Sequence, residues 1–220
     1  MKRKIIVTAD GSTTIHLPDW DEQYHSKHGA IQEAFHVFIK NGLSLFSNTK
    51  IRILEIGFGT GLNSFITFLE APKLNLAIDY VGVEAYPIGE EEIRQLNYVK
   101  TLKADGFRNV FDEMHHQIWD FKNKFSATFC LTKRKQFFNE INDKDAFDLI
   151  YFDAFGARVQ PELWTEVLFK KMYIALKSDG VLVTYSAKGS VRRAMQSVGF
   201  AVERLAGPPG KREMLRATKK

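Results

Sequence analysis

The chain has 220 residues, of which 45% are hydrophobic, and this is enough for one domain with a sizeable core. No apolar run approaches the roughly 20 residues that cross a bilayer, and the start, MKRKIIVTADGS, lacks the apolar core of a signal peptide. The single cysteine, Cys130, excludes a disulfide framework within the chain and favours a reducing, cytoplasmic setting, while the net charge of +5 permits an anionic partner such as RNA without requiring one.

The first 48 residues predict a short extension before the main domain. Residues 4–17 contain two alternating β-type runs around Asp10-Gly11, a strong turn pair, and therefore predict a hairpin. From Ala30 apolar residues recur at helical spacing, and Gly42 stands where a helix cap is expected. We expect residues 1–48 to pack over a ligand site that belongs to a second unit, residues 49–220.

From residue 51 the pattern changes to alternating strands and helices. This alternation predicts an α/β fold with a mostly parallel central sheet, helices on both faces and an antiparallel final strand. Residues 105–122 show no clear period. The predicted strands are 51–56, 77–84, 125–131, 147–153 and 180–186, with a closing β pair at 201–205 and 212–218; the predicted helices are 60–71, 88–102, a short one near 135–141, 161–176 and one starting at 191.

A glycine-rich loop follows the first of these strands, in the string ILEIGFGTGLNS. Gly57, Gly59 and Gly61 allow a sharp turn and the close approach of a ligand, and the next helix offers free N–H groups. A dinucleotide site prefers G-x-G-x-x-G, and an acidic Glu55 before the loop would repel a pyrophosphate. A cationic ligand without phosphate, S-adenosyl-L-methionine, fits better, with Glu55 holding its positive end. A glycine turn without any function is the alternative.

Two more acidic residues end predicted strands. Glu84 closes the second strand and is placed to accept hydrogen bonds from ribose hydroxyls. Asp153 closes the fourth, between Phe152 and Phe155, where burial of a charge is costly unless the charge is paired or used. The alternatives are a solvated strand end for Glu84 and a loop cap for Asp153. The sequence does not identify the adenine contacts.

Several strings in one order resemble a known family. They are Tyr24-x-Ser26 with Glu33, the EIGFGTGLN loop, FDAF, PELWT, AKGSVRR and GPPGKREML. Together they resemble the methyltransferase domain of the bifunctional tRNA 5-methylaminomethyl-2-thiouridine biosynthesis protein, over nearly all of residues 20–217. The resemblance implies a class I S-adenosyl-L-methionine-dependent methyltransferase fold, which is Rossmann-like. It also implies methylation of the amine of 5-aminomethyl-2-thiouridine at the tRNA wobble position.

The chemistry of methyl transfer and the positions of the residues in the chain predict individual roles. Asp153 is the expected catalytic residue, which accepts an N–H of the substrate amine and takes up or relays its proton. The expected cofactor-binding residues are Glu55, Gly57, Phe58, Gly59, Gly61, Asn63, Glu84 and Asp153. The expected substrate-binding residues are Tyr24, Ser26, Phe155, Lys188, Lys211 and Arg212, the last two on tRNA phosphate. Core packing or solvated charge is the alternative for each. The histidines at 25, 28 and 36 fit no standard zinc spacing, so no metal is expected.

The chain ends at Lys220 and contains no second glycine fingerprint, so we expect a stand-alone methyltransferase without the flavin oxidoreductase half. A separate enzyme system would then supply the aminomethyl uridine. Three other functions remain open from sequence: an amine methyltransferase for a small molecule, a nicotinamide-dependent oxidoreductase, and an inactive RNA-binding module. The oligomeric state is not predicted.

Overall fold

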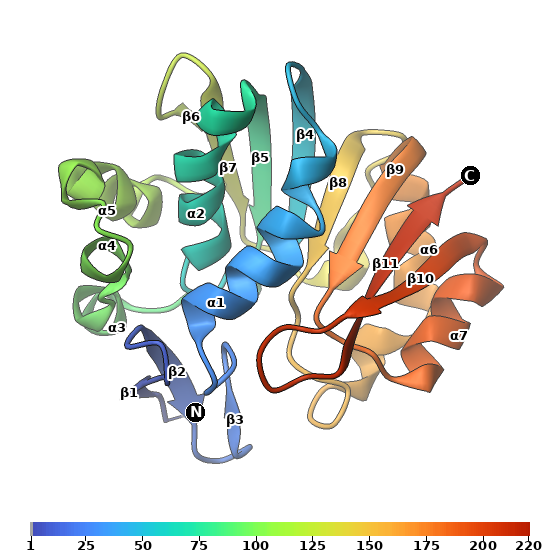
Figure 1. Ribbon diagram of the computed structural model, residues 1–220, viewed down its shortest axis with the longest axis horizontal. Coiled ribbons are helices and arrows are strands. Elements are labelled where there is room, and N and C mark those ends of the chain that lie inside the picture. Colours follow the sequence, from blue (N-terminus) through green and yellow to red (C-terminus); the bar gives the residue numbers. More distant parts are fainter. Residues whose placement is uncertain (1) are drawn as a thin grey trace.

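The computed structural model describes residues 2–220, and its main body is an eight-stranded sheet (Figure 1). Its strands are β4 (Lys50–Ile56), β5 (Ala77–Val83), β6 (Lys122–Lys124), β7 (Phe129–Arg134), β8 (Phe147–Phe152), β9 (Leu176–Thr184), β10 (Phe200–Ala206) and β11 (Glu213–Lys219). The strand order is β10-β11-β9-β8-β4-β5-β7-β6. The strands from β9 to β7 are parallel, while β6 and β11 join antiparallel. The predicted fold class is confirmed.

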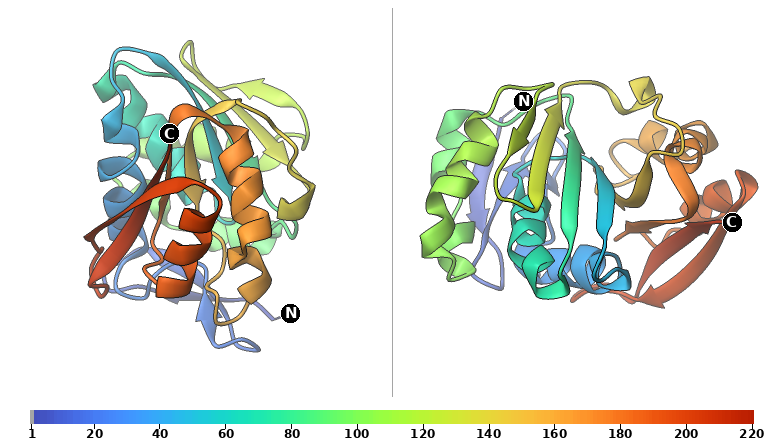
Figure 2. Two further views of the ribbon diagram at one scale, coloured as in Figure 1. Left: turned by 90° about the vertical axis from the view of Figure 1, so that its right-hand side faces the viewer. Right: turned by 90° about the horizontal axis from the view of Figure 1, so that it is seen from above.

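Helices cover both faces of this sheet, which explains why its inner strands are nearly continuous apolar runs (Figure 2). They are α1 (Ala30–Ala34), α2 (Leu62–Glu70), α3 (Glu90–Gln95), α4 (Tyr98–Thr101), α5 (Arg108–His116), α6 (Glu166–Ala175) and α7 (Gly189–Ser197). On one face Ile53 and Tyr80 share a buried cluster with side chains of α1, α2 and α5. On the other face Leu54 and Ile150 share a cluster with α6 and α7. Alternating side chains of each strand therefore serve two cores.

A small antiparallel sheet lies near the edge at which the parallel strands end, at the bottom of Figure 1. It consists of β1 (Lys4–Val7), β2 (Thr13–Leu17) and β3 (Glu22–Gln23). The hairpin predicted over residues 4–17 forms β1 and β2, whereas β3 was not predicted. The division at residue 48 stays a prediction. Ala34 and Phe38 of the expected extension lie in the same core as Ile53 of β4.

The helix that begins at Ala30 continues as a π-helical segment, Phe35–Lys40, and the expected role of Gly42 as its cap is wrong. The φ angle of Gly42 is −122°, outside the left-handed region that caps helices. A Cβ at this position would lie 2.6 Å from the carbonyl oxygen of Phe38. Glycine is needed here for close packing.

The helix predicted over residues 88–102 is divided into α3 and α4 by a contact with the small sheet. The side chain of Asn97, between the two helices, accepts a hydrogen bond from the Thr13 N–H at 2.8 Å. The Asn97 N–H in turn donates to Thr13 Oγ1 at 3.0 Å. This reciprocal pair fastens the small sheet to the main body, and the tertiary contact overrides local helix propensity.

Two other predicted elements have different boundaries. The strand predicted over 125–131 begins only at Phe129, because residues 125–128 form the turn that joins β6 to β7. The helix predicted over 161–176 is a 3₁₀ turn, Pro161–Trp164, followed by α6. Thr165 between them is extended, with φ −96° and ψ 159°. The ambiguous stretch 105–122 contains α5.

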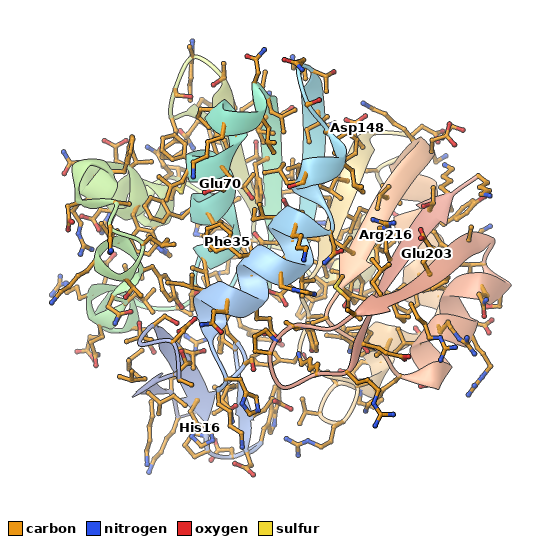
Figure 3. The ribbon with its side chains drawn as sticks, in the orientation of Figure 1. His16, Phe35, Glu70, Asp148, Glu203 and Arg216 are labelled. Atoms are coloured by element: carbon orange, nitrogen blue, oxygen red, sulfur yellow. The ribbon has the colours of Figure 1, made fainter. Side chains whose placement is uncertain are left out.

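The last two strands pair along their whole length, from Phe200 opposite Lys219 to Ala206 opposite Glu213. On this pair Arg216 Nη2 lies 3.1 Å from Glu203 Oε2, between directly opposed residues (Figure 3). The predicted closing β pair is confirmed. Its connection, residues 207–212, lies next to the helix that starts at Ala30 (Figure 1).

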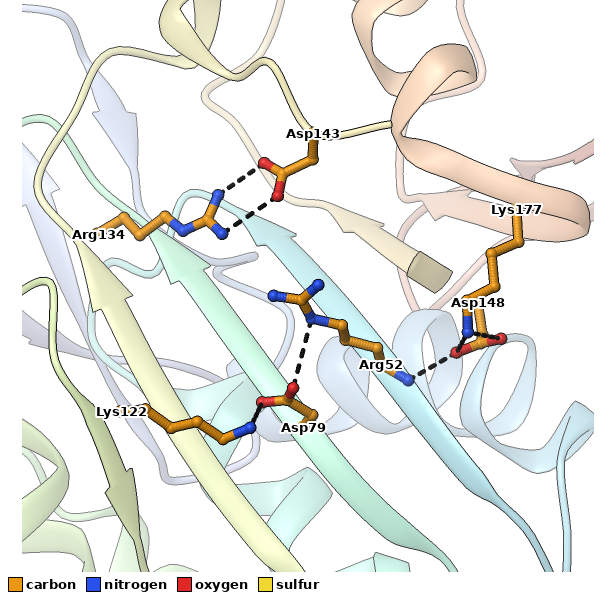
Figure 4. A network of polar contacts seen from close by, with 7 residues as sticks. All are labelled: Arg52, Asp79, Lys122, Arg134, Asp143, Asp148 and Lys177. Atoms are coloured by element: carbon orange, nitrogen blue, oxygen red, sulfur yellow. Dashed lines mark hydrogen bonds and ion pairs between the residues drawn. The ribbon is translucent and has the colours of Figure 1, made fainter. Parts of the chain in front are cut away.

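The face that carries Leu54 and Ile150 also carries paired charges, on Arg52 of β4, Asp79 of β5, Lys122 of β6 and Arg134 of β7 (Figure 4). Asp79 contacts Arg52 Nε at 3.4 Å and Lys122 Nζ at 2.9 Å. Arg134 donates two hydrogen bonds to Asp143, at 2.6 and 3.2 Å. Such partly exposed pairs contribute about 0–1 kcal/mol each, so we interpret these positions as a solvated margin of the buried cluster.

Gly82 on β5 leaves room for the ring of Phe58, which belongs to the glycine loop. A Cβ at Gly82 would lie 2.4 Å from Phe58 Cδ2. We expect Gly82→Ala to displace this ring and to lower the free energy of unfolding by about 1–3 kcal/mol, as overpacked cores do. Urea denaturation checks this, with Gly106→Ala as the control, because a Cβ there meets nothing within 4 Å. Equal unfolding midpoints for the two variants would contradict the packing argument.

Candidate functional site

A cavity of about 880 Å³ opens where β4, β5 and β8 end. Its walls come from the glycine loop after β4, the segment after β5, the loop after β8, the small N-terminal sheet and the start of α6. Its volume is in the range of about 300–1,000 Å³ that is typical of small-ligand sites. In parallel α/β sheets the carboxyl ends of the strands are the usual place for a ligand.

The glycine loop forms the floor of the cavity, and its backbone has left-handed φ angles of 91°, 49° and 70° at Gly57, Gly59 and Gly61. A Cβ on Gly57 would lie 2.8 Å from the Asp153 carbonyl oxygen. A Cβ on Gly59 would lie 3.2 Å from the ring of Tyr24. Gly57, Phe58 and Gly59 line the cavity, whereas Gly61 does not and begins α2 as its N-cap. The loop therefore brings bare backbone to the cavity.

Glu84 is held in place by the backbone on both of its carboxylate oxygens. Its Oε2 accepts from the Gly59 N–H at 3.0 Å, and its Oε1 accepts from the Tyr86 N–H at 2.9 Å. Each carboxylate oxygen can accept a second hydrogen bond. Glu84 also lines the cavity, so a pair of ligand hydroxyl groups can be received there.

Asp153 and Glu55 are joined by a single amide. Asn63 Nδ2 donates to Asp153 Oδ2 at 2.8 Å and to Glu55 Oε1 at 2.9 Å. Asp153 and Asn63 line the cavity, whereas Glu55 is fully buried beneath them. Glu55 does not line the cavity and is joined to it through Asn63, so its expected hold on a positively charged ligand, electrostatic or through ordered water, stays a prediction.

Burial dominates the electrostatics of both carboxyl groups. It raises the pKa of Asp153 from 3.8 to about 7, with a further increase from the charge of Glu33 and opposing effects from Asn63 and Lys211. Burial also raises the pKa of Glu55 well above its usual value. At neutral pH Asp153 is poised between its two forms. A group poised in this way is suited to take up a proton.

Aromatic rings form one wall of the cavity, and the ring of Tyr24 lies next to Gly59 of the glycine loop. The ring of Phe155 makes edge contacts with Trp20 at 5.7 Å and with Tyr24 at 4.9 Å between centroids, and all three line the cavity. Burial raises the pKa of Tyr24 to about 12, so its hydroxyl stays protonated. Rings in this arrangement can receive a planar or a cationic ligand.

Four residues expected on the substrate side do not line the cavity. Lys188 caps α7 and is exposed, and Arg212 is exposed as well. The Lys211 ammonium points inward, 2.5 Å from Glu33 Oε2, so the structure does not give it the phosphate contact that was expected. Ser26 Oγ accepts from the His28 N–H at 3.2 Å.

Other cavity residues were missed by the sequence analysis. Phe137 and Asn139, which follow β7, line the cavity on the side of Glu84. They follow the third parallel strand, and the sequence had not identified them as ligand contacts. His25 also lines the cavity, and burial lowers its pKa to about 4, so it is neutral. Phe137 and Asn139 could have been found from sequence, because the string KQFFNE follows a predicted strand and such positions line ligand sites. Trp20 and His25 reach the cavity only through tertiary packing.

Metal-binding groups and membrane spans were also sought. Among residues 2–220 no three His, Cys, Asp or Glu side chains are grouped as metal ligands. Within the same residues no helix is both long and apolar enough to cross a bilayer.

Comparison with known proteins gives one family. The family described as S-adenosyl-L-methionine-dependent methyltransferase matches residues 99–220. Curated relatives include the tRNA 5-methylaminomethyl-2-thiouridine biosynthesis bifunctional proteins MnmC of Idiomarina loihiensis and Marinomonas sp.. They are 29% and 28% identical over 89% and 90% of this chain. The chain spans only 35% and 31% of their lengths.

Solved structures give the same fold. MNMC2 from Aquifex aeolicus superimposes with a TM-score of 0.81 at 24% identity and covers all of this chain and 70% of its own. Spermidine synthase from Thermotoga maritima superimposes with a TM-score of 0.57 at 16% identity, over 95% of this chain and 69% of its own. At these identities the two structures support the fold alone.

The raised pKa of Asp153 has a consequence for stability. Because the folded pKa, about 7, is above the ordinary 3.8, folding disfavours the ionised form. The contribution of the protonated Asp153 carboxyl group to the free energy of unfolding is fully present below pH ~4. It is lost as the pH rises through ~7. We expect Asp153→Asn to raise the free energy of unfolding by on the order of 2–4 kcal/mol at pH 8 and by little near pH 4. The new amide oxygen can still accept from Asn63.

Urea denaturation at several pH values measures this gain. The exposed Asp19→Asn is the control and should show no comparable change with pH. An Asp153→Asn gain that is the same at every pH would contradict the buried, raised carboxyl group.

Proposed function

Because this chain belongs to the S-adenosyl-L-methionine-dependent methyltransferase family, we propose that it methylates an amine on tRNA. The proposed substrate is 5-aminomethyl-2-thiouridine at the wobble position, and the product is 5-methylaminomethyl-2-thiouridine. The names of the curated relatives carry this modification, and they match about nine-tenths of the chain. The observation that carries the proposal is the half-buried Asp153 on the wall of a cavity whose floor is a glycine loop.

The cavity fits S-adenosyl-L-methionine. The glycine loop leaves the floor free of side chains at two positions where a Cβ would meet Asp153 or Tyr24. Glu84 would hold the ribose hydroxyls with the lone pairs that its two backbone contacts leave free. Phe137 and Asn139 would contact the adenine from the segment after β7. When bound, the cofactor supplies a methyl group on a positively charged sulfur, which keeps the electrons of the broken C–S bond.

Asp153 prepares the amine for this transfer. An alkyl amine is mostly protonated at neutral pH and then has no lone pair to offer, since lysine-like amines have a pKa of about 10.4. The Asp153 carboxylate can accept an N–H of the amine and take the proton that the nitrogen must lose overall. Its pKa of about 7 is close to the working pH, at which a general base is most effective. Asn63 fixes the carboxylate by its hydrogen bond of 2.8 Å.

The aromatic wall would receive the uracil ring. Tyr24, Trp20 and Phe155 lie around the cavity, and the loop of Phe155 also carries Asp153. A base that stacks there would bring its aminomethyl group toward the carboxylate. The exposed Lys188 and Arg212 are proposed to contact tRNA phosphates outside the cavity.

The setting of the reaction is also a proposal. We place it in the cytoplasm, with a separate enzyme system supplying the aminomethyl uridine. Residues 1–48 are proposed as a unit over the cofactor site, because Tyr24 and Leu17 line the cavity while the helix from Ala30 lies in the core.

The function is tested with tRNA that carries the aminomethyl nucleoside. We expect wild-type protein and S-adenosyl-L-methionine to convert it to the methylaminomethyl form, as detected by mass spectrometry of nucleosides. Asp153→Asn should lose most turnover while its dissociation constant for the cofactor stays within about twofold, because the residue acts on the amine. Unchanged turnover in this variant would remove the proposed role of Asp153.

Salt separates a tRNA substrate from a small amine. The KM for tRNA should rise steeply between about 50 and 200 mM salt, because phosphate contacts release counterions. A small free amine that is methylated as fast as tRNA, with no dependence on salt, would support the small-molecule alternative.

Glu84 provides a test of cofactor binding that is independent of the tRNA. Glu84→Ala should weaken binding of S-adenosyl-L-homocysteine about ten- to hundredfold, since hydrogen bonds to charged groups contribute roughly 1.5–3 kcal/mol. Isothermal titration calorimetry measures this, with the exposed Glu91→Ala on α3 as the control. Identical dissociation constants for the Glu84 and Glu91 variants would contradict the ribose contact.

A further inference from the structure

We propose that Lys211 is a positioning residue for the reacting carboxylate: it is held between Glu33 and the ring of Tyr185, where its charge favours the ionised form of Asp153. This inference rests on the proposed function, in which Asp153 acts on the substrate amine. It gives Lys211 of the GPPGKR loop, residues 207–212, a role inside the protein instead of on the RNA.

The ammonium group of Lys211 has two partners within the fold. Its Nζ lies 2.5 Å from Glu33 Oε2 and 3.8 Å from the centroid of the Tyr185 ring. Glu33 is only 7% exposed, and its Oε1 accepts from the Ser26 N–H at 3.0 Å. Both oxygens of a buried carboxylate are therefore engaged, one of them by a residue 178 positions away in the chain.

The loop that carries Lys211 is built to hold it in this direction. The Lys211 N–H donates to the Pro208 carbonyl at 2.9 Å, and the Gly207 N–H donates to the Arg212 carbonyl at 3.0 Å. A Cβ on Gly207 would lie 2.5 Å from the Lys211 carbonyl oxygen. Gly210 has φ +83°, and a Cβ there would collide with His28. The two glycines are thus required by the tight turn, whose side chain at 211 is turned inward.

Tyr185 connects this cluster to the loop that follows β8. Its hydroxyl donates to the Ala154 carbonyl at 2.8 Å, and burial keeps the pKa of this hydroxyl well above 10. The Trp164 indole N–H donates to the next carbonyl, that of Phe155, at 2.7 Å. The loop of Asp153 is therefore fixed by two buried aromatic donors, and Lys211 lies against the ring of one of them.

The two members of the ion pair, Glu33 and Lys211, shift the pKa of Asp153 in opposite directions. Glu33 raises the pKa of Asp153, and Lys211 lowers it. The titratable groups facing Asp153 from the elements around it are Glu33 of α1, Glu55 of β4, Tyr80 of β5, Tyr185 after β9 and Lys211 of the 207–212 loop. Among these groups Lys211 is the cation. Its removal leaves Asp153 next to an uncompensated Glu33.

The experiment follows the ionisation of Asp153 itself. The carboxyl carbon of Asp153 is observed by ¹³C NMR, assigned with Asp153→Asn, and titrated in the protein without ligands. We expect Lys211→Met to raise the midpoint of the Asp153 titration by about one pH unit and Glu33→Gln to lower it, because Lys211 lowers the pKa of Asp153 and Glu33 raises it. Lys211→Arg keeps the charge and should titrate like wild type.

The control removes a positive charge from the far end of the sheet. Lys50→Met, at the first residue of β4, should leave the midpoint unchanged, since the site lies where that strand ends.

In the tRNA assay Lys211→Met should lose turnover roughly tenfold at pH 6 and recover it at alkaline pH, because one pH unit on the acid limb corresponds to a tenfold change. Its affinity for S-adenosyl-L-homocysteine should match that of wild type.

The outcomes separate this inference from the proposed function. Midpoints that do not move in opposite directions for Lys211→Met and Glu33→Gln overturn the role of Lys211, whether or not tRNA is methylated. If Lys211→Met fails to fold, the other two variants test the role of Lys211. A lowered midpoint in Glu33→Gln and a wild-type midpoint in Lys211→Arg support it, and any other pair of results overturns it. Shifted midpoints in a protein that does not methylate tRNA overturn the proposed function and leave the electrostatic link intact.

Discussion

The site depends on a half-buried carboxylate at the end of a buried strand. Asp153 follows β8 directly, and its N–H donates to the Ile56 carbonyl at 2.9 Å, so the glycine loop and the reacting loop share a hydrogen bond. Its side chain shares the Asn63 amide with Glu55. A buried charge of this kind costs stability, and the two apolar cores on either side of the sheet offset that cost. The same burial brings the pKa of the carboxyl group close to the pH at which the group has to exchange a proton.

The short motifs predicted the cofactor half of the site because strand-then-loop units place their residues locally. Gly57, Gly59, Glu84 and Asp153 each follow a strand directly, and parallel strands bring such residues to one edge. The roles of these residues stay proposals, but their convergence on one cavity follows from the sequence pattern. Glu55 shows the limit of this reasoning. Its position beside the loop was evident, whereas its burial beneath Asn63 depends on how α2 packs.

The substrate half depends on contacts between distant parts of the chain. Lys211 meets Glu33 across 178 positions, and Tyr185 meets Ala154 across 31. No local periodicity encodes such pairs, so a basic loop was interpreted as RNA-facing when its lysine points inward. The same cause divides the helix predicted over 88–102. Thr13 of the small sheet holds Asn97 by two hydrogen bonds, and local helix propensity does not anticipate this contact.

The central claim is that Asp153 receives the amine of the substrate. The most direct test is a crystal structure with S-adenosyl-L-homocysteine and an oligonucleotide that carries 5-aminomethyl-2-thiouridine. The account predicts the aminomethyl nitrogen within about 2.6–3.2 Å of an Asp153 carboxylate oxygen, with the uracil ring against the aromatic wall. A nucleoside bound with its nitrogen away from Asp153, and Asp153 still held only by Asn63, would contradict it.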